Sequence, residues 1–154
     1  MKVAAVHDHN HGKERFDTEP GLRDELFDLF TRQEIDFETM DPRDIKRVVA
    51  KGFNQKGWAD SVCVGKSNLT ISFLKCGVGL CFQLGNVART YADLLKLQFL
   101  FQQGSISLGV VVVPVMRASR QLGSNHASYD RLVTEIEMFR DTISAPIVVI
   151  GIES

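Results

Sequence analysis

The stretch from Leu108 to Val115 constrains the fold more than any other part of this sequence, because it is a nearly continuous run of apolar residues. Such a run is too short to cross a membrane and is typical of a strand at the centre of a sheet, buried on both faces. Residues 147–152 form a second apolar strand near the end of the chain. Helices on both sides of the sheet are needed to bury such strands. The sequence therefore predicts an α/β fold with a mixed central β-sheet flanked by helices on both sides.

The remaining pattern supplies further strands and helices. Strands are expected at residues 3–7, 60–64, 69–75 and 78–84, the last two forming a hairpin that turns at Cys76-Gly77. Helix starts are expected at Thr18-Glu19-Pro20, Asp41-Pro42, Asn86 and Asn125, with Gly52 and Gly104 ending the second and third helices. The helix that begins after Asn86 is apolar on more than one side, which favours burial on two faces or contact with a partner. No linker or repeat divides the chain, so a single domain over residues 1–154 is expected.

Composition and charge narrow the class of protein. With 44% hydrophobic and 24% charged residues, the chain is expected to fold rather than remain disordered. No secretory signal or membrane span is visible and the three cysteines lack metal-finger spacing, which favours a cytoplasmic protein with reduced thiols. The net charge of −1 argues against non-specific coating of nucleic acid. Residues 75–120 nevertheless contain five basic residues and one acidic residue, so this part either faces a polyanion or carries ordinary solvated charges.

The segment Ile71–Arg89 carries the most informative pattern, which is a hairpin followed by a Gly-Asn turn and a helix. This segment resembles the active-site hairpin of type II restriction endonucleases of the BglII-like family, within the PD-(D/E)xK nuclease superfamily. The similarity extends over most of the chain, through the segments His9–Gly12, Phe53–Trp58, Asp93–Lys96, Val113–Met116 and Pro146–Ile152. The resemblance implies a restriction-endonuclease-like core, a DNA partner and a homodimer, since family members act as two-fold dimers on palindromic sites.

The sequence departs from this family at the catalytic positions. The resemblance places the family's Asp at Ser72 and its Glu at Cys81, while the family's Gln is retained at Gln83. Cleavage in such enzymes needs a divalent cation held by carboxylates, and a hydroxyl and a thiol are poor ligands for Mg²⁺. The sequence therefore predicts that no metal is bound and that cleavage is lost, unless a carboxylate arrives from another element.

Replacement carboxylates can be named by residue type alone. The candidates are Glu25, Glu34, Asp60 and Asp93. Each is otherwise expected to be a solvated charge, and Asp93 is placed to pair with Arg89 one helical turn earlier.

DNA contacts are implied by the same resemblance. The region after the central strand lies near DNA in the family, and here it contains Arg117, Arg120, Ser124 and Asn125, with His126 beside them. Arginine and asparagine suit phosphate and base contacts, although a polar loop that caps a helix has the same composition. Lys75, Arg89 and Lys96 are further candidates for phosphate contacts or are ordinary solvated residues.

Three smaller clusters have competing interpretations. His7, His9 and His11 alternate as on one strand face, so they either bind a metal such as zinc or are surface histidines, which we favour. Cys76 and Cys81 either pair across the hairpin or remain small buried thiols, which we favour. A catalytic Cys81–His126 couple is conceivable, but no sequence feature brings the two residues together.

Three hypotheses for function follow. The leading one is a restriction-endonuclease-like DNA-binding protein that has lost Mg²⁺-dependent phosphodiester cleavage. The first alternative is an active metal-dependent type II endonuclease with displaced ligands, which would use Mg²⁺. The second is a protein-interaction domain that partners or inhibits a nuclease.

Overall fold

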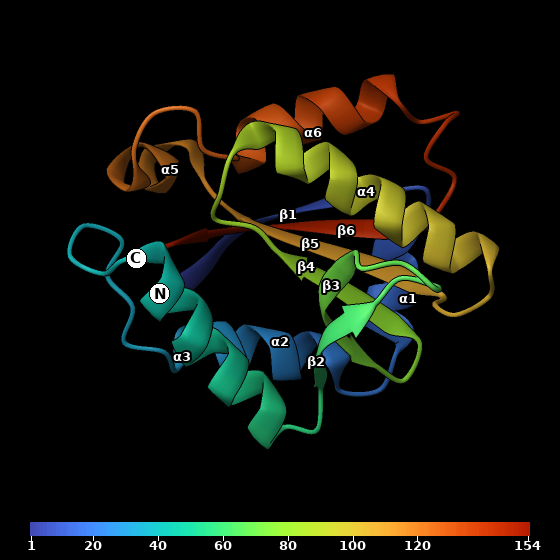
Figure 1. Ribbon diagram of the computed structural model, residues 1–154, viewed down its shortest axis with the longest axis horizontal. Helices are drawn as coiled ribbons and strands as arrows, with labels where there is room; N and C mark the ends of the chain where they lie inside the picture. Colours follow the sequence, from blue (N-terminus) through green and yellow to red (C-terminus); the bar gives the residue numbers. More distant parts are fainter.

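A mixed six-stranded sheet forms the centre of the computed structural model, which describes residues 1–154 (Figure 1). In spatial order its strands are β1 (Lys2–His9), β6 (Ile147–Glu153), β5 (Leu108–Pro114), β4 (Val78–Phe82), β3 (Thr70–Lys75) and β2 (Ala59–Cys63). Strands β4, β5 and β6 run parallel to one another, and the other neighbouring pairs are antiparallel. All of β5 and all but the last residue of β6 are buried, which confirms the prediction from their apolar runs.

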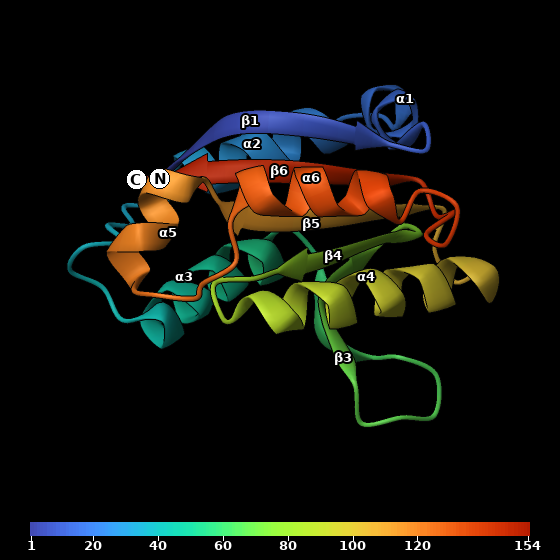
Figure 2. The same ribbon diagram turned by 90° about the horizontal axis from the view of Figure 1, so that it is seen from above.

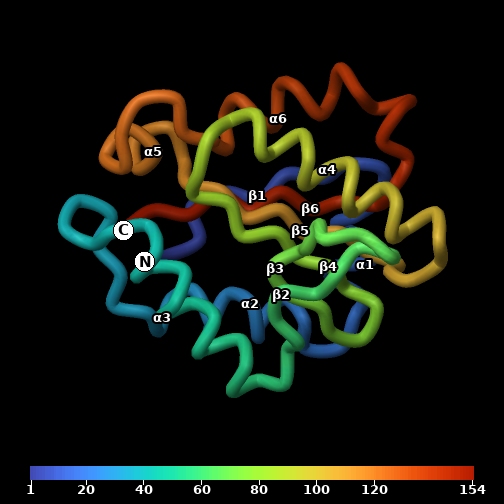
Figure 3. The backbone as a smooth tube through the Cα atoms, in the orientation of Figure 1, coloured from blue at the N-terminus to red at the C-terminus, as the bar shows by residue number.

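Helices cover both faces of this sheet, as the sequence predicts (Figure 2). One face is covered by α1 (Gly12–Thr18), α2 (Leu22–Thr31) and α3 (Pro42–Gln55), and the other by α4 (Val87–Gln102) and α6 (Tyr129–Met138). The short helix α5 (Met116–Leu122) follows β5 at one end of the sheet. The chain ends lie close together, where Lys2 and Glu153 form an ion pair at 3.2 Å (Figure 3). None of the helices is both long and apolar enough to span a lipid bilayer.

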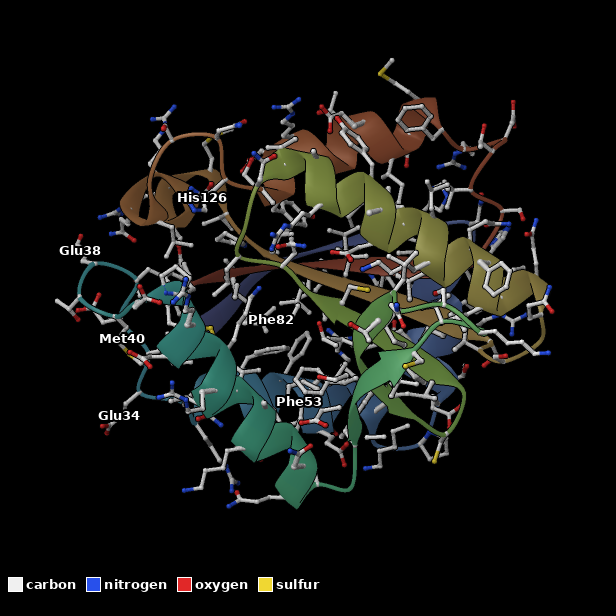
Figure 4. All side chains as sticks on the ribbon, viewed as in Figure 1. Glu34, Glu38, Met40, Phe53, Phe82 and His126 are labelled. Atoms are coloured by element: carbon white, nitrogen blue, oxygen red, sulfur yellow. The ribbon has the colours of Figure 1, made fainter.

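Aromatic residues fill the core under α2 and α3. The ring of Phe53 stacks on that of Phe73 at 4.2 Å between centroids, and Phe30 stacks on Phe82 at 6.1 Å. Phe53 and Phe82 reach this core from α3 and β4 (Figure 4). This packing fixes α3 against the end of β4, and the candidate site lies beside it.

Two of the four predicted helix starts are confirmed by the hydrogen bonds of their capping side chains. Asp41 accepts a hydrogen bond from the Arg43 amide and Asn86 accepts one from the Ala88 amide, so both caps are confirmed. The second helix, however, runs past Gly52 to Gln55, which makes that predicted end wrong.

Two helix starts were predicted incorrectly and two short helices were missed. Thr18 ends α1, and Gly21 with a φ of 71° precedes α2, so the helix does not begin at Thr18-Glu19-Pro20. Asn125 has a φ of 65° and lies in a loop, whereas α6 begins after Ser128. Both α1 and α5 contain only seven residues, which is too short for a clear periodic signal.

The predicted hairpin turn at Cys76-Gly77 is confirmed. Both residues have positive φ, 47° and 75°, as the tightest hairpin turns require. All three cysteines are free, so no disulfide crosses the hairpin. Cys81 is buried as expected, but Cys76 is exposed because it occupies the turn, and the interpretation of two buried thiols is wrong for Cys76.

The three N-terminal histidines have different environments. His9 is fully buried, its Nε2–H donates to the Ile143 carbonyl at 2.6 Å, and its Nδ1 has no partner. His7 lies 2.9 Å from a Glu137 oxygen, while His11 is exposed. The interpretation as surface histidines is therefore wrong for His9, which joins β1 to the segment before β6.

Acid is expected to weaken the fold through His9. Burial lowers the pKa of the His9 imidazole below its ordinary 6.5, although Ile143 and Glu137 oppose this shift. The folded protein therefore favours the neutral ring, so this contribution to stability is full above pH 6.5 and is lost as the pH falls toward the lowered folded pKa. In urea unfolding at pH 7.5 and 5.5, the wild type should lose about 1 kcal/mol more than His9→Gln. Equal losses in both proteins would contradict this role.

Candidate functional site

A cleft of about 500 Å³ opens between α3 and α4, beside the end of β4. Its walls also include β2, β3 and the loop between them, which projects beyond the sheet (Figure 2). Two of the three predicted catalytic positions, Ser72 and Gln83, line this cleft, and the predicted DNA-binding residue Arg89 lies at its α4 side. The structure therefore brings together residues from β3, the loop after β4 and α4.

Neither Ser72 nor Cys81 offers a free, charged ligand to a metal ion in this structure. The hydroxyl oxygen of Ser72 accepts a hydrogen bond from the Phe82 amide at 2.9 Å, where the regular β3–β4 pairing stops. Cys81 is only 1% exposed and packs in the apolar cluster under α4. Burial, with the Asp93 carboxylate nearby, raises the pKa of the Cys81 thiol well above its ordinary value. The thiol therefore stays protonated at neutral pH and acts as a small core side chain.

Gln83 is held in a buried polar network with α4. Its Nε2–H donates to the Asp93 carboxylate at 2.7 Å, and its Oε1 accepts from the Gly85 amide at 2.8 Å. The Lys96 ammonium donates to the other Asp93 oxygen at 2.6 Å and to the Thr70 carbonyl at 2.9 Å. The network ties the loop after β4 and the edge of β3 to one turn of α4.

Asp93 differs from its sequence-based interpretation in two ways. It is 5% exposed rather than solvated, and its cationic partner is Lys96 rather than Arg89. The helix turns Asp93 toward Gln83 and the sheet, while Arg89 remains exposed over the cleft. Sequence spacing allows both pairs, and only the packing of α4 on the sheet selects one.

A hard dication does not fit this set of groups. The Ser72 hydroxyl already accepts from a backbone amide, the Cys81 thiol is protonated, and both polar ends of Gln83 are engaged. The single buried carboxylate, Asp93, is neutralised by Lys96. No group of three or more His, Cys, Asp or Glu side chains is arranged to hold a metal ion. Mg²⁺ prefers several hard oxygen ligands with net negative charge, which this cleft lacks.

The other candidate carboxylates lie at different places. Asp60 is exposed at the β2 wall of the cleft and accepts from the Asn54 amide at 3.2 Å. Glu34 points outward from the loop between α2 and α3, far from the cleft (Figure 4). Glu25 accepts from the Trp58 indole at 2.6 Å and from Lys75 at 2.8 Å, so its interpretation as a solvated charge is wrong. Burial alone would raise the Glu25 pKa, but these hydrogen bonds outweigh it and lower that pKa.

Lys75 is the last residue of β3, next to the hairpin turn. Its ammonium donates to both Glu25 oxygens and to the Lys56 carbonyl at 2.8 Å, against α2. It does not line the cleft that holds Arg89. Its position therefore favours a structural role over the phosphate contact that its residue type allows.

The remaining predicted DNA-binding residues lie together on α5 and the loop after it. Arg117, Arg120, Ser124 and Asn125 are all exposed. The Asn125 carbonyl accepts from the Val87 amide at 3.2 Å, which joins this loop to the start of α4. His126 lies in the same loop (Figure 4), and no hydrogen bond joins it to Cys81. These residues and Arg89 therefore surround one end of the sheet.

Comparison with known proteins identifies relatives of this fold. A family model described as restriction endonuclease BglII/BglIII matches residues 4–152. The crystal structure of restriction endonuclease BglII complexed with a DNA 16-mer matches with a TM-score of 0.83 at 15% identity, covering 100% of this chain and 79% of that one. Free BglII matches with a TM-score of 0.78 at 14% identity, covering 100% and 80%. No curated protein matches the sequence.

Proposed function

This chain belongs to the BglII/BglIII restriction endonuclease family, and from this membership we propose that it binds DNA but does not cleave it by a Mg²⁺-dependent reaction. The proposed absence of Mg²⁺-dependent cleavage rests on one observation. The only buried carboxylate beside the family's catalytic positions, Asp93 on α4, is paired with Lys96 instead of being free to hold a cation. Without a bound dication, the cleft lacks the group that activates water in Mg²⁺-dependent cleavage.

DNA binding is assigned to the exposed residues around the same end of the sheet. The proposed DNA-binding face consists of Arg89, Arg117, Arg120, Ser124 and Asn125. The guanidinium groups suit phosphate oxygens or the edge of guanine, and Ser124 and Asn125 suit hydrogen bonds to the backbone or to bases. The similarity in fold to a restriction endonuclease crystallised with a DNA 16-mer supports DNA as the partner.

The proposed face is tested by charge removal. In fluorescence anisotropy with labelled duplex DNA, Arg117→Ala and Arg120→Ala should each weaken binding by about 5- to 10-fold at 0.1 M salt, because each removes a phosphate contact and its counterion release. The matched control is Arg15→Ala on α1, an exposed arginine away from this face. The wild type should also lose affinity steeply as salt rises. Unchanged affinity in both α5 variants would show that Arg117 and Arg120 do not contact DNA.

A homodimer is part of the proposal. Apolar side chains on α4 and at the C-terminal end of α6 are exposed, namely Leu95 at 60%, Phe99 at 41%, Met138 at 77% and Phe139 at 40%. Helix α4, which the sequence predicts to contact a partner, thus has exposed apolar residues. The end of α6 adds further exposed apolar residues. Sedimentation of the purified chain at micromolar concentration should give a dimer, and a monomer would contradict this part.

The active enzyme with displaced ligands remains the second candidate, because two carboxylates, Asp60 and Asp93, line the cleft. Plasmid DNA incubated with Mg²⁺ or Mn²⁺ separates the two proposals. We expect no nicking by the wild type beyond that of Asp93→Asn. Nicking that requires the metal and disappears in Asp93→Asn would establish the second candidate instead.

A further inference from the structure

Two positive side chains face the cleft without any acidic partner. Lys46 from α3 and Arg89 from α4 both line it. Neither side chain takes part in any of the ten ion pairs of the structure. The third cation in the cleft, Lys96, is already matched by Asp93 at 2.6 Å. The cleft thus contains two cations outside any ion pair and one such carboxylate, Asp60, which leaves a net positive charge.

The positions of Lys46 and Arg89 bring their charges together. Partial burial of the Lys46 ammonium lowers its pKa. The positive charge of Arg89 lowers this pKa further, while the Asp93 carboxylate opposes the shift. The Arg89 side chain also lies against the loop after β4, since a Cβ at Gly85 would be 3.6 Å from its Cδ. The two like charges therefore face the same space above Gln83, an arrangement that an anion between them would stabilise.

We propose that Lys46 and Arg89 together hold a backbone phosphate of DNA in this cleft without a metal ion. The inference rests on the proposed DNA-binding function and assigns it a phosphate site. Arginine offers a planar fork of N–H donors and lysine a mobile point charge, which together suit a phosphodiester oxygen pair. The two protein cations then provide the charge compensation for phosphate that the cleft cannot obtain from a dication.

A phosphodiester group is favoured over other anions by the surroundings. The cleft has room for more than an isolated ion, and its floor includes the aromatic residues Phe73 and Phe82. Asn68 and Thr70 add polar groups along the β3 side. The exposed Arg117 and Arg120 continue the positive charge around the same end of the sheet, as a strand of several phosphates requires.

The test measures binding of labelled duplex DNA by anisotropy, with EDTA and with Mg²⁺, over a range of salt concentrations. The wild type should bind in EDTA, and Mg²⁺ should not strengthen binding, because it competes for the DNA phosphates. Lys46→Met/Arg89→Met should bind about 10- to 100-fold more weakly at 0.1 M salt, with a logarithmic salt slope shallower by about 2. Both replaced residues are exposed, so the variant should fold, which circular dichroism checks. The control Arg15→Met/Lys51→Met has the same change in charge at exposed positions outside the cleft.

The outcomes separate the phosphate site from the proposed function. Wild-type binding that needs Mg²⁺, or a Lys46→Met/Arg89→Met variant that binds as tightly as the control, would overturn the phosphate site and leave DNA binding intact. A wild type that binds no DNA even at low salt would overturn both. Metal-independent binding lost only in the cleft variant is the result that supports the site.

Discussion

Replacing Gly12 with alanine is expected to lower the free energy of unfolding by about 2–4 kcal/mol, as overpacking against rigid atoms does. A Cβ at position 12 would lie 2.4 Å from the Ile147 carbonyl oxygen and 2.7 Å from the Ile147 amide nitrogen. These are backbone atoms of a buried residue at the start of β6, so no rotamer change relieves the overlap. Gly12 is the first residue of α1, where the helix preference of alanine contributes less than in a helix interior, so the overlap decides the sign.

Gly52 provides the matched control for this prediction. It also lies within a helix, but a Cβ there would meet the end of the flexible Gln33 side chain at 2.5 Å and no backbone. Gly52→Ala should therefore change stability by less than about 1 kcal/mol, because the amide can move aside. Urea unfolding of both variants measures the difference, and equal effects would show that the close approach of α1 to β6 is not what requires Gly12.

Replacing Asp93 with leucine is expected to destabilise the protein by about 3–5 kcal/mol, the usual effect of removing one partner from a buried ion pair. Lys96 would keep its charge with its side chain only 16% exposed, and the Gln83 amide would lose its acceptor. The double variant Asp93→Leu/Lys96→Met should recover much of the loss, because it removes the unpaired charge.

The sign of this effect separates a structural acid from a metal ligand. In a metal site without its ion, neighbouring carboxylates repel one another. Removing one of them therefore stabilises the fold. Asp93 instead lies between Lys96 and Gln83. Asp93→Asn should therefore also lower stability in denaturant unfolding. An increase in stability would contradict the assignment of Asp93 as a structural partner.

Features set by local sequence could be predicted, whereas those set by packing could not. The apolar run of β5, the capping side chains of Asp41 and Asn86 and the turn at Cys76-Gly77 each depend on a few adjacent residues. Asn125 has an equally good capping side chain, but its left-handed backbone places it in a loop instead. The same local signal is correct at Asp41 and Asn86 and wrong at Thr18 and Asn125.

The candidate site was predicted in part. The family resemblance located the β3–β4 hairpin, and the structure gathers Ser72, Gln83 and Arg89 at one cleft. Lys46 was missed because nothing in its neighbourhood along the chain distinguishes it from other helix cations. The partner of Asp93 was missed because two cations lie at helical spacing from it, and only the buried face of α4 selects Lys96.

Whether the cleft holds a divalent cation is measured most directly by a titration with Mn²⁺. This ion prefers the same oxygen ligands as Mg²⁺ and is followed by its electron paramagnetic resonance signal. The protein–DNA complex is compared with the same DNA alone and with the complex of Asp93→Asn. We expect the wild-type complex to bind no more Mn²⁺ than DNA alone does. One tightly bound ion per chain that is lost in Asp93→Asn would contradict it.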